Sequence, residues 1–287
     1  MRAVRWLVIV AGLLFAALPL VWMGLSSIKH RPDTISQHLR WIPAAEAPTD
    51  LTSSSFEATS DSYRDLATVH AGAQHSFWTH LWNSVVIGVL STIASVALGT
   101  LCAYGFSRFR VPGEKDWLFF ILSTRFMPPL AVVVPVLMMY RALDLQGTHL
   151  GLALLYTVFN LSLAVWLMKG FLDEIPRAYE EAAVVDGYSR LGAFVRIVLP
   201  EARTGIAVTA VFCLISAWNE YGFAMTLNSS SAVTVPAYFA GLQGNIEGMP
   251  WPQIAAGALI FVTPIVVFTV LVRSHLLRGV TFGTVKQ

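Results

Sequence analysis

Long apolar runs are the feature that most constrains how this chain can fold. Six stretches of roughly 20 residues carry almost no charge, and a helix of that length crosses about 30 Å of hydrocarbon. The runs are too long and too uniformly apolar for the alternating strands of a membrane barrel. They are Trp6–Leu25, Asn83–Phe106, Trp117–Tyr140, Leu150–Met168, Gly205–Leu227 and Ile254–Val272. The sequence therefore predicts an all-α integral membrane protein with six transmembrane helices.

Composition supports membrane insertion and argues against several other classes. Charged residues make up 13% of the 287 residues, whereas a soluble domain usually carries about 25%. The net charge of +2 is small and the basic residues are scattered, so nothing indicates binding to nucleic acid. Cys102 and Cys213 both lie in apolar runs, which favours ordinary core positions over disulfides or metal ligands. We expect no metal site.

The distribution of lysine and arginine predicts the orientation, because cytoplasmic loops are enriched in both. With the N-terminus inside, most basic residues fall in inner segments, and the short outer loops hold little more than Arg141. The first apolar run has too long a core for a signal peptide and no A-x-A site after it, so we expect an uncleaved helix. We predict that both termini are cytoplasmic.

Three parts of the chain are distinguished on this basis. Residues 1–28 are expected to form an N-terminal segment with the first transmembrane helix. Residues 29–80, rich in proline, serine and threonine, are expected to form an extracytoplasmic loop. Residues 81–287 are expected to form the main transmembrane domain, with a cytoplasmic loop at residues 173–203.

The cytoplasmic loop contains a charged, amphipathic stretch that reads as two short helices. Pro176 suits the first turn of the first helix, and Gly187 can adopt a left-handed conformation that ends it. Ser189 is positioned to cap the second helix, and we expect Pro200 to close it. The apolar residues of that second helix repeat at helical spacing and are Leu191, Phe194, Val195, Val198 and Leu199.

Glu180 and Glu181 precede the small pair Ala182 and Ala183. Small side chains let another surface approach closely, and an acidic pair attracts a basic partner. We interpret the first helix as a docking site for a cytosolic protein. The alternative is a connector that lies on the lipid headgroups, which would explain the second helix but not the acidic pair.

The spacing of this stretch resembles the EAA coupling loop of permease subunits from binding-protein-dependent ABC importers. Glu181, Ala182 and Ala183 are followed after three residues by Gly187, and after nine more by Ile197-x-Leu199-Pro200. Other segments are similar to the carbohydrate branch, and more narrowly to the maltose-permease-type smaller subunit. These segments are Phe77–Ser84, Ala103–Lys115, Ala217–Leu227 and Arg278–Lys286.

The resemblance implies an ABC importer type I permease fold in a bacterial inner membrane and import of a sugar, sugar alcohol or related polyol. It implies three kinds of partner: a second permease subunit, two copies of a cytosolic ABC ATPase, and an extracytoplasmic solute-binding protein. The sequence has no G-x-x-x-x-G-K-[ST] phosphate loop. We therefore expect this chain to be a non-catalytic subunit without a cofactor, while ATP and Mg bind to the partner ATPase.

The resemblance also implies roles for particular residues. The expected ATPase-coupling residues are Glu180, Glu181, Ala182, Ala183, Asp186, Gly187, Ile197, Leu199 and Pro200. The expected ATPase-contacting tail contains Arg278, Gly279 and Lys286. The loop expected to face the solute-binding protein contains Tyr238, Phe239, Gly241 and Gln243. An aromatic belt at the bilayer interface would give a similar composition to this last loop.

Arg125, Asn219 and Glu220 interrupt apolar runs, and such residues often mark a transport pathway. Counted at about 1.5 Å per residue, Arg125 lies near the cytoplasmic side and Glu220 near the outer side, so no direct ion pair is expected. Arg125 could instead extend toward the headgroups, and the other two could cap a helix end. Pro128 and Pro129 predict a kink beside Arg125.

A repeat of small residues, Ser91, Ser95, Gly99 and Ala103, predicts a face where helices approach closely. We favour packing within this chain over packing on a partner permease. Two other functions fit the sequence less well. A secondary transporter or channel would use Arg125 and Glu220 for ion coupling but leaves the docking helix unexplained. An intramembrane enzyme would need a nucleophile or metal motif, and the sequence contains none.

Overall fold

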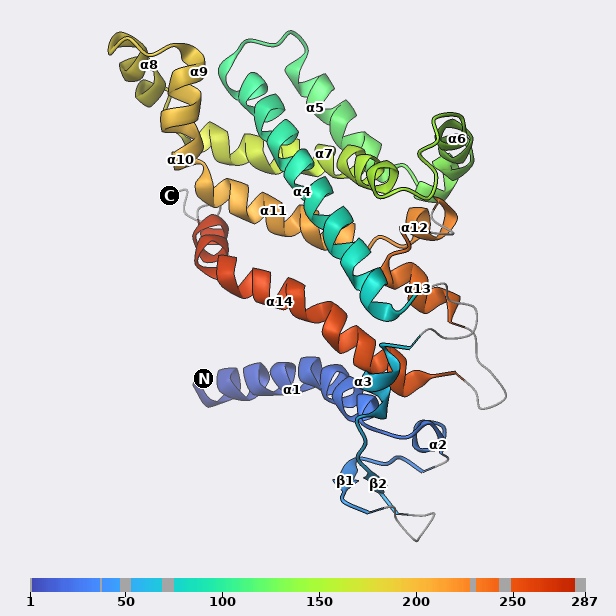
Figure 1. Ribbon diagram of the computed structural model, residues 1–287. Coiled ribbons are helices and arrows are strands. Elements are labelled where there is room, and N and C mark those ends of the chain that lie inside the picture. The colour runs from blue at the N-terminus through green and yellow to red at the C-terminus, as the bar shows by residue number, and fades with distance from the viewer. Residues whose placement is uncertain are drawn as a thin grey trace. The chain divides into compact units, whose positions relative to one another are not determined.

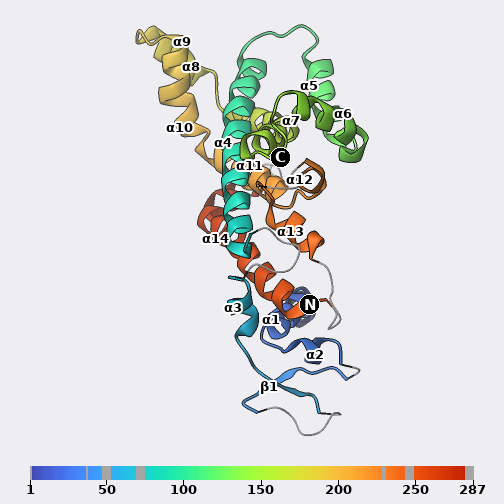
Figure 2. The ribbon, with the colours of Figure 1, turned by 45° about the vertical axis from the view of Figure 1, so that its right-hand side comes forward.

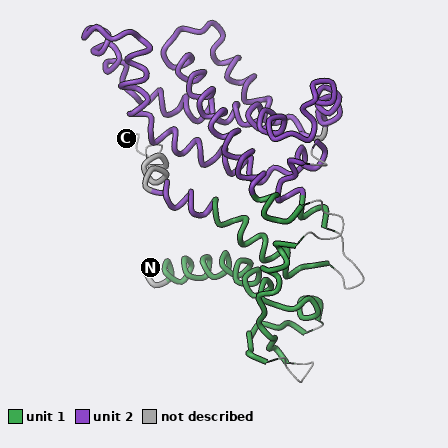
Figure 3. Tube along the Cα trace, in the orientation of Figure 1, with its two compact units in different colours: residues 1–81, 238–264 green, residues 82–237, 265–287 purple. Residues whose placement is uncertain are grey.

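The computed structural model describes residues 2–36, 38–46, 53–68, 75–227, 231–242 and 249–281. The chain divides into two compact units, each built from two stretches of sequence (Figure 3). The first unit contains residues 1–81 and 238–264, and the second contains residues 82–237 and 265–287.

The first unit combines a long apolar helix with a small polar fold. Its elements are α1 (Arg2–Ser27), α2 (Arg31–Thr34), β1 (Ile42–Ala44), β2 (Ser55–Glu57), α3 (Asp61–Asp65), the start of α4 (Phe77–Arg108), the end of α13 (Val235–Gly241) and the first part of α14 (Trp251–Thr281). The two strands are parallel, with Pro43 opposite Phe56. The expected loop at residues 29–80 therefore contains secondary structure of its own.

Lys29 is the centre of this polar fold. Its side chain is 1% exposed, and its Nζ donates to the carbonyl of Arg40 at 2.5 Å. The ammonium lies 4.2 Å from the ring centroid of Trp22 and 4.9 Å from that of Phe56. Burial lowers the pKa of Lys29 from its ordinary value.

The second unit is a helical assembly built around α4, α7 and α11 (Figures 1 and 2). Besides most of α4 and the end of α14, its elements are α5 (Glu114–Ser123), the 3-10 helix η1 (Thr124–Phe126), α6 (Pro129–Ala142), α7 (His149–Glu174), α8 (Ala178–Val185), α9 (Arg190–Ala193), the π-helix η2 (Phe194–Val198), α10 (Leu199–Glu201), α11 (Arg203–Trp218) and α12 (Gly222–Leu227).

Small residues let α4 pack closely on α7. Ser91, Ser95 and Ala103 are fully buried, and the Ser95 hydroxyl donates to the carbonyl of Thr157 on α7 at 3.3 Å. A Cβ added to Gly99 would lie 2.5 Å from the Cβ of Ala164, so no larger residue fits there. The predicted small-residue face is confirmed as a contact within this chain.

Four helices in the described part of the chain are long and apolar enough to cross a membrane. They are Val4–Ser27, Phe77–Arg108, His149–Glu174 and Trp251–Arg273. Two bent pairs could each supply one more span. Glu114–Phe126 meets Ala131–Ala142 at 90°, and Arg190–Glu201 meets Arg203–Trp218 at 72°. The prediction of six spans therefore holds only if each bent pair counts as one.

The third predicted run, Trp117–Tyr140, breaks at its two prolines. A residue before proline is pushed out of the helical region, and Met127 is accordingly extended, with φ −66° and ψ 123°. Pro128 is extended as well, with ψ 125°. The expected kink is thus a complete interruption, and Pro129 begins a new helix where its missing N–H costs no hydrogen bond.

The fifth predicted run, Gly205–Leu227, is also two helices rather than one. Helix α11 ends at Trp218, Asn219 follows it with φ −91° and ψ 1°, and α12 begins at Gly222. The prediction of one continuous helix was wrong. Hydropathy does not show that the Glu220 side chain can bond to nearby backbone N–H groups and so interrupt the helix.

Candidate functional site

The first candidate site is the segment from α8 to α10, at one end of the second unit and away from α12 (Figures 1 and 2). Helix α8 ends in a Schellman motif, in which Gly187 N–H donates to the Val184 carbonyl at 3.1 Å and Tyr188 N–H donates to the Ala183 carbonyl at 3.0 Å. Gly187 has φ +91°, so its predicted left-handed conformation is confirmed. Pro176 lies two residues before α8 rather than in its first turn.

The second half of this segment departs from a regular helix. The Ser189 hydroxyl accepts from Gly192 N–H at 3.1 Å, which confirms the predicted cap. A π turn then runs from Phe194 to Val198, and the helix continues through Pro200 to Glu201. The prediction that Pro200 closes this helix was wrong, since the 72° bend follows it.

The predicted apolar face of this segment divides. Phe194 and Val198 are buried, whereas Leu191 is 69% exposed and Val195 is 51% exposed. Leu191 lies before the π turn, so the longer repeat of that turn does not account for its exposure. The Phe194 ring packs on Tyr104 of α4 with centroids 4.3 Å apart, so that side of the segment is the buried one.

The two adjacent glutamates of α8 have different environments. The Glu180 carboxylate forms an ion pair with Arg108, and the two side chains are 13% and 7% exposed. It also accepts from the Tyr104 hydroxyl at 2.7 Å. The side chain of Glu181 is exposed. Of these two glutamates, therefore, Glu181 is the one whose carboxylate lies at the surface.

Most of the remaining coupling residues lie at the surface of the same segment. Ala183 is the exception on α8, because it is 2% exposed. Ile197 and Leu199 are half-buried. The exposed members are Glu181, Ala182, Asp186, Gly187 and Pro200. The exposed surface of α8 and its turn is thus acidic, small and apolar, with Val185 86% exposed beside it.

The second candidate site is a pocket of about 200 Å³ in the second unit. It is lined by Arg125, Met127, Pro129, Tyr156, Phe159, Asn160, Ser216, Ala217, Glu220 and Phe223. Arg125 and Glu220 both line this pocket, a proximity that counting residues along each helix did not indicate. Among the described residues no ion pair joins the two side chains.

Glu220 is held by the start of α12. Its carboxylate accepts from Phe223 N–H at 3.0 Å and Ala224 N–H at 3.3 Å. The Tyr156 hydroxyl donates a third bond at 2.6 Å. The two alternatives for Glu220, capping and cavity lining, thus occur together. Asn219 does not line the pocket, since its side chain donates back to the Ile215 carbonyl at 2.8 Å.

Arg125 makes one weak contact, from Nη1 to the carbonyl of Phe159 at 3.4 Å. Its guanidinium is exposed. Asn160 lies in the same pocket and donates to the carbonyl of Cys213 at 3.2 Å. Sequence analysis did not identify Tyr156 or Asn160, although an amide inside an apolar helix is itself a signal, because it needs a hydrogen-bond partner there.

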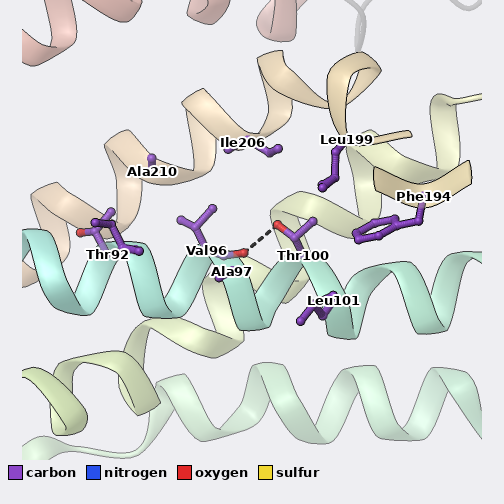
Figure 4. Close-up of a pocket in the computed structure, with 10 residues that line it drawn as sticks. Thr92, Val96, Ala97, Thr100, Leu101, Phe194, Leu199, Ile206 and Ala210 are labelled. Atoms are coloured by element: carbon purple, nitrogen blue, oxygen red, sulfur yellow. Dashed lines mark hydrogen bonds between the residues drawn. The ribbon is translucent and has the colours of Figure 1, made fainter. Parts of the chain in front are cut away.

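A larger groove of about 480 Å³ lies between α4, α11 and the segment from α8 to α10, here called the coupling segment (Figure 4). It is lined by Thr92, Ile93, Val96, Ala97, Thr100, Leu101, Phe194, Leu199, Ile206 and Ala210. The Thr100 hydroxyl donates to the carbonyl of Val96 at 2.6 Å, and Thr92 is the other polar residue among those that line the groove. A polyhydroxylated solute would lose most of its hydrogen bonds to water here without replacing them.

The remaining predicted residues are only partly within the described structure. Arg278 and Gly279 lie in α14, and only their helical backbone is described. Gln243 and Lys286 lie outside the described residues. Tyr238 is 5% exposed, and its ring stacks on His80 with centroids 4.6 Å apart. Its face is therefore not displayed to a partner. Phe239 is half-buried, and Gly241 is exposed at the end of α13.

The sequence of this chain matches a known protein family. Residues 95–281 match the model for "Binding-protein-dependent transport system inner membrane component". The trehalose transport system permease protein SugB of Mycobacterium tuberculosis is 31% identical, covering 99% of this chain and 98% of that protein. The trehalose/maltose transport system permease protein MalG of Thermococcus litoralis is 28% identical, covering 98% and 97%.

A solved structure supports the fold. A bacterial ABC transporter involved in the import of the acidic polysaccharide alginate contains a chain that superposes with a TM-score of 0.72 at 20% identity, over 95% of each chain. The family match covers the last part of α4 and all of α5 to α14, and so includes both candidate sites. This chain belongs to the family of inner membrane components of binding-protein-dependent transport systems.

Proposed function

We propose that this chain is the permease subunit of an ATP-driven importer for a sugar, sugar alcohol or related polyol. It would work in a bacterial inner membrane with a second permease, two copies of an ABC ATPase and a solute-binding protein. The substrate class is supported by the names of two relatives, which refer to trehalose and maltose. ATP and Mg would bind to the ATPase subunits and not to this chain.

The observation that carries this proposal is the exposed surface at the end of α8. Glu181 offers a carboxylate, Ala182 permits close approach, and Gly187 turns the chain sharply at φ +91°. These groups form a compact knob that a cleft on an ATPase could enclose. In this proposal the knob, and both chain termini, face the cytoplasm, and both bent helix pairs count as spans.

The pocket around Arg125 and Glu220 would form part of the translocation pathway. It provides donors from Arg125, Asn160 and Ser216 beside the rings of Phe159 and Phe223, whose centroids are 4.9 Å apart. A site near the middle of the spans, exposed alternately to each side, is the arrangement that alternating access requires. Hydroxyl groups of a polyol would find hydrogen-bond partners here, unlike in the apolar groove.

Glu181→Lys tests the coupling role. We expect normal membrane insertion but loss of the ATPase when the complex is purified through a tag on this chain, because a like charge would face the basic partner. Asp116→Lys is the matched control, since Asp116 is an exposed carboxylate at the start of α5. Retention of the ATPase and unchanged sugar uptake in Glu181→Lys would remove the coupling assignment.

A further inference from the structure

Arg108, at the last turn of α4, connects three helices through its guanidinium. It pairs with Glu180 on α8, and its Nη1 donates to the Leu172 carbonyl at 3.1 Å. Its Nη2 donates to the Ile175 carbonyl at 3.0 Å. Leu172 lies in the last turn of α7, and Ile175 directly follows that helix. One buried side chain thus joins α4, the end of α7 and α8.

Glu180 is bound on both carboxylate oxygens. Arg108 contacts Oε1, and the Tyr104 hydroxyl donates to Oε2 at 2.7 Å. The Tyr104 ring in turn packs on Phe194 of the coupling segment, with centroids 4.3 Å apart. A carboxylate that is 13% exposed and fully engaged has no free face for a basic residue of another protein.

Further polar contacts extend this attachment to the neighbouring helix ends. Arg177 donates to the Ser107 carbonyl at 2.7 Å, and the Ser107 hydroxyl donates to Asp173 at 2.6 Å. Lys169 pairs with Asp173 at 2.7 Å and with Glu114 on α5 at 3.1 Å. Arg177 therefore attaches the start of α8 to α4, and α4, α7 and α5 are joined to one another beside it by charge-assisted hydrogen bonds, which are stronger than neutral ones.

We propose that Glu180 is a positioning residue that joins α8 rigidly to α4 and α7, rather than a contact to the ATPase. This inference rests on the proposed function, in which the ATPase grips α8. When α8 moves, the backbone can transmit that movement to α11 through α10. The bend between α10 and α11 can flex, so this route is compliant. The Arg108–Glu180 pair instead joins α8 directly to α4 and to the end of α7, so these helices move together with α8.

The test uses the complete complex, with the cysteines at 102 and 213 replaced by alanine. Nitroxide labels are attached at Ala178→Cys on α8 and Leu98→Cys on α4, both of which are exposed. In the complex with native Glu180 we expect one narrow inter-label distance that does not change when MgATP is added. In Glu180→Gln we expect the ATPase still to co-purify, the distance distribution to broaden with MgATP, and uptake to fall about tenfold.

Asp116→Asn is the control for loss of one negative charge near this end of the second unit, and it should leave the distance and the uptake unchanged. If Glu180→Gln does not accumulate in the membrane, Tyr104→Phe is measured in its place. It removes the hydroxyl donor to Glu180 and keeps the ring on Phe194. A distance that stays narrow with MgATP in that variant would overturn the proposal, as it would in Glu180→Gln.

Two outcomes separate this inference from the proposed function. Loss of the ATPase in Glu180→Gln would make Glu180 part of the docking surface, so the inference fails and the coupling role stands. Retention of the ATPase and full uptake in both Glu181→Lys and Glu180→Gln would remove the coupling role itself.

Discussion

In two regions of the second unit an arginine and a glutamate lie near each other, and the two regions differ in whether these side chains form an ion pair. At the end of α4, Arg108 and Glu180 form a direct ion pair with side chains 7% and 13% exposed. In the pocket, Arg125 and Glu220 line one cavity without an ion pair among the described residues. Glu220 is held by backbone and hydroxyl donors instead, and Arg125 has one weak carbonyl contact.

This difference indicates that the two regions serve different purposes. A buried, fully paired charge fixes helices relative to one another, and removing either partner leaves the other without compensation. A guanidinium that remains exposed beside a satisfied carboxylate keeps its donors available for a solute. The first arrangement favours rigidity, and the second favours binding.

The largest effect should come from Arg108→Met. This change leaves Glu180 buried without its cation and removes the donors to two α7 carbonyls, so the free energy of unfolding should fall by about 3–5 kcal/mol. Thermal unfolding of the detergent-solubilised chain measures it. Arg110→Met is the control, because Arg110 is exposed. Equal melting temperatures for the two variants would contradict a structural role for the pair.

Glu220→Ala should have an intermediate effect. It removes the acceptor for two N–H groups at the start of α12, and loss of such a cap costs about 0.5–2 kcal/mol. The same thermal measurement applies. Glu220→Gln keeps one acceptor oxygen and should lose less. An unchanged melting temperature for Glu220→Ala would contradict the capping role.

Arg125→Ala should have the smallest effect on stability, within about 0.5 kcal/mol, since the exposed side chain makes one weak contact. Transport should nevertheless fall, because the pocket loses its only cationic lining residue. Uptake of whichever sugar the wild-type complex carries, measured alongside ATPase co-purification, tests this. Wild-type uptake in this variant would remove Arg125 from the pathway and leave the contrast with Arg108 purely structural.

Much of the coupling segment could be predicted from sequence, because its features are local. The left-handed Gly187 and the Ser189 cap depend on neighbours within a few residues. The exposure of Leu191 could not be predicted, since residue spacing does not show which part of an apolar face the neighbouring helices cover. The partner of Glu180 lies 72 residues away, beyond the reach of any local pattern.

The candidate pocket shows the same division. Its charged residues were identified individually, because a charge in an apolar run is conspicuous wherever it lies. That they line one pocket was not predicted, because a count along each helix does not show how η1, α7 and the end of α11 pack together.

The sequence by itself determined the membrane class, the small-residue packing face and the compact turn after α8. Each follows from hydropathy, side-chain size or backbone preference, which act over a few neighbouring residues. Only the tertiary structure decided that Glu180 is buried and Glu181 exposed, and that Arg125 and Glu220 share a pocket. Those outcomes depend on how helices distant in sequence pack together, and burial and pairing are properties of that arrangement rather than of any one residue.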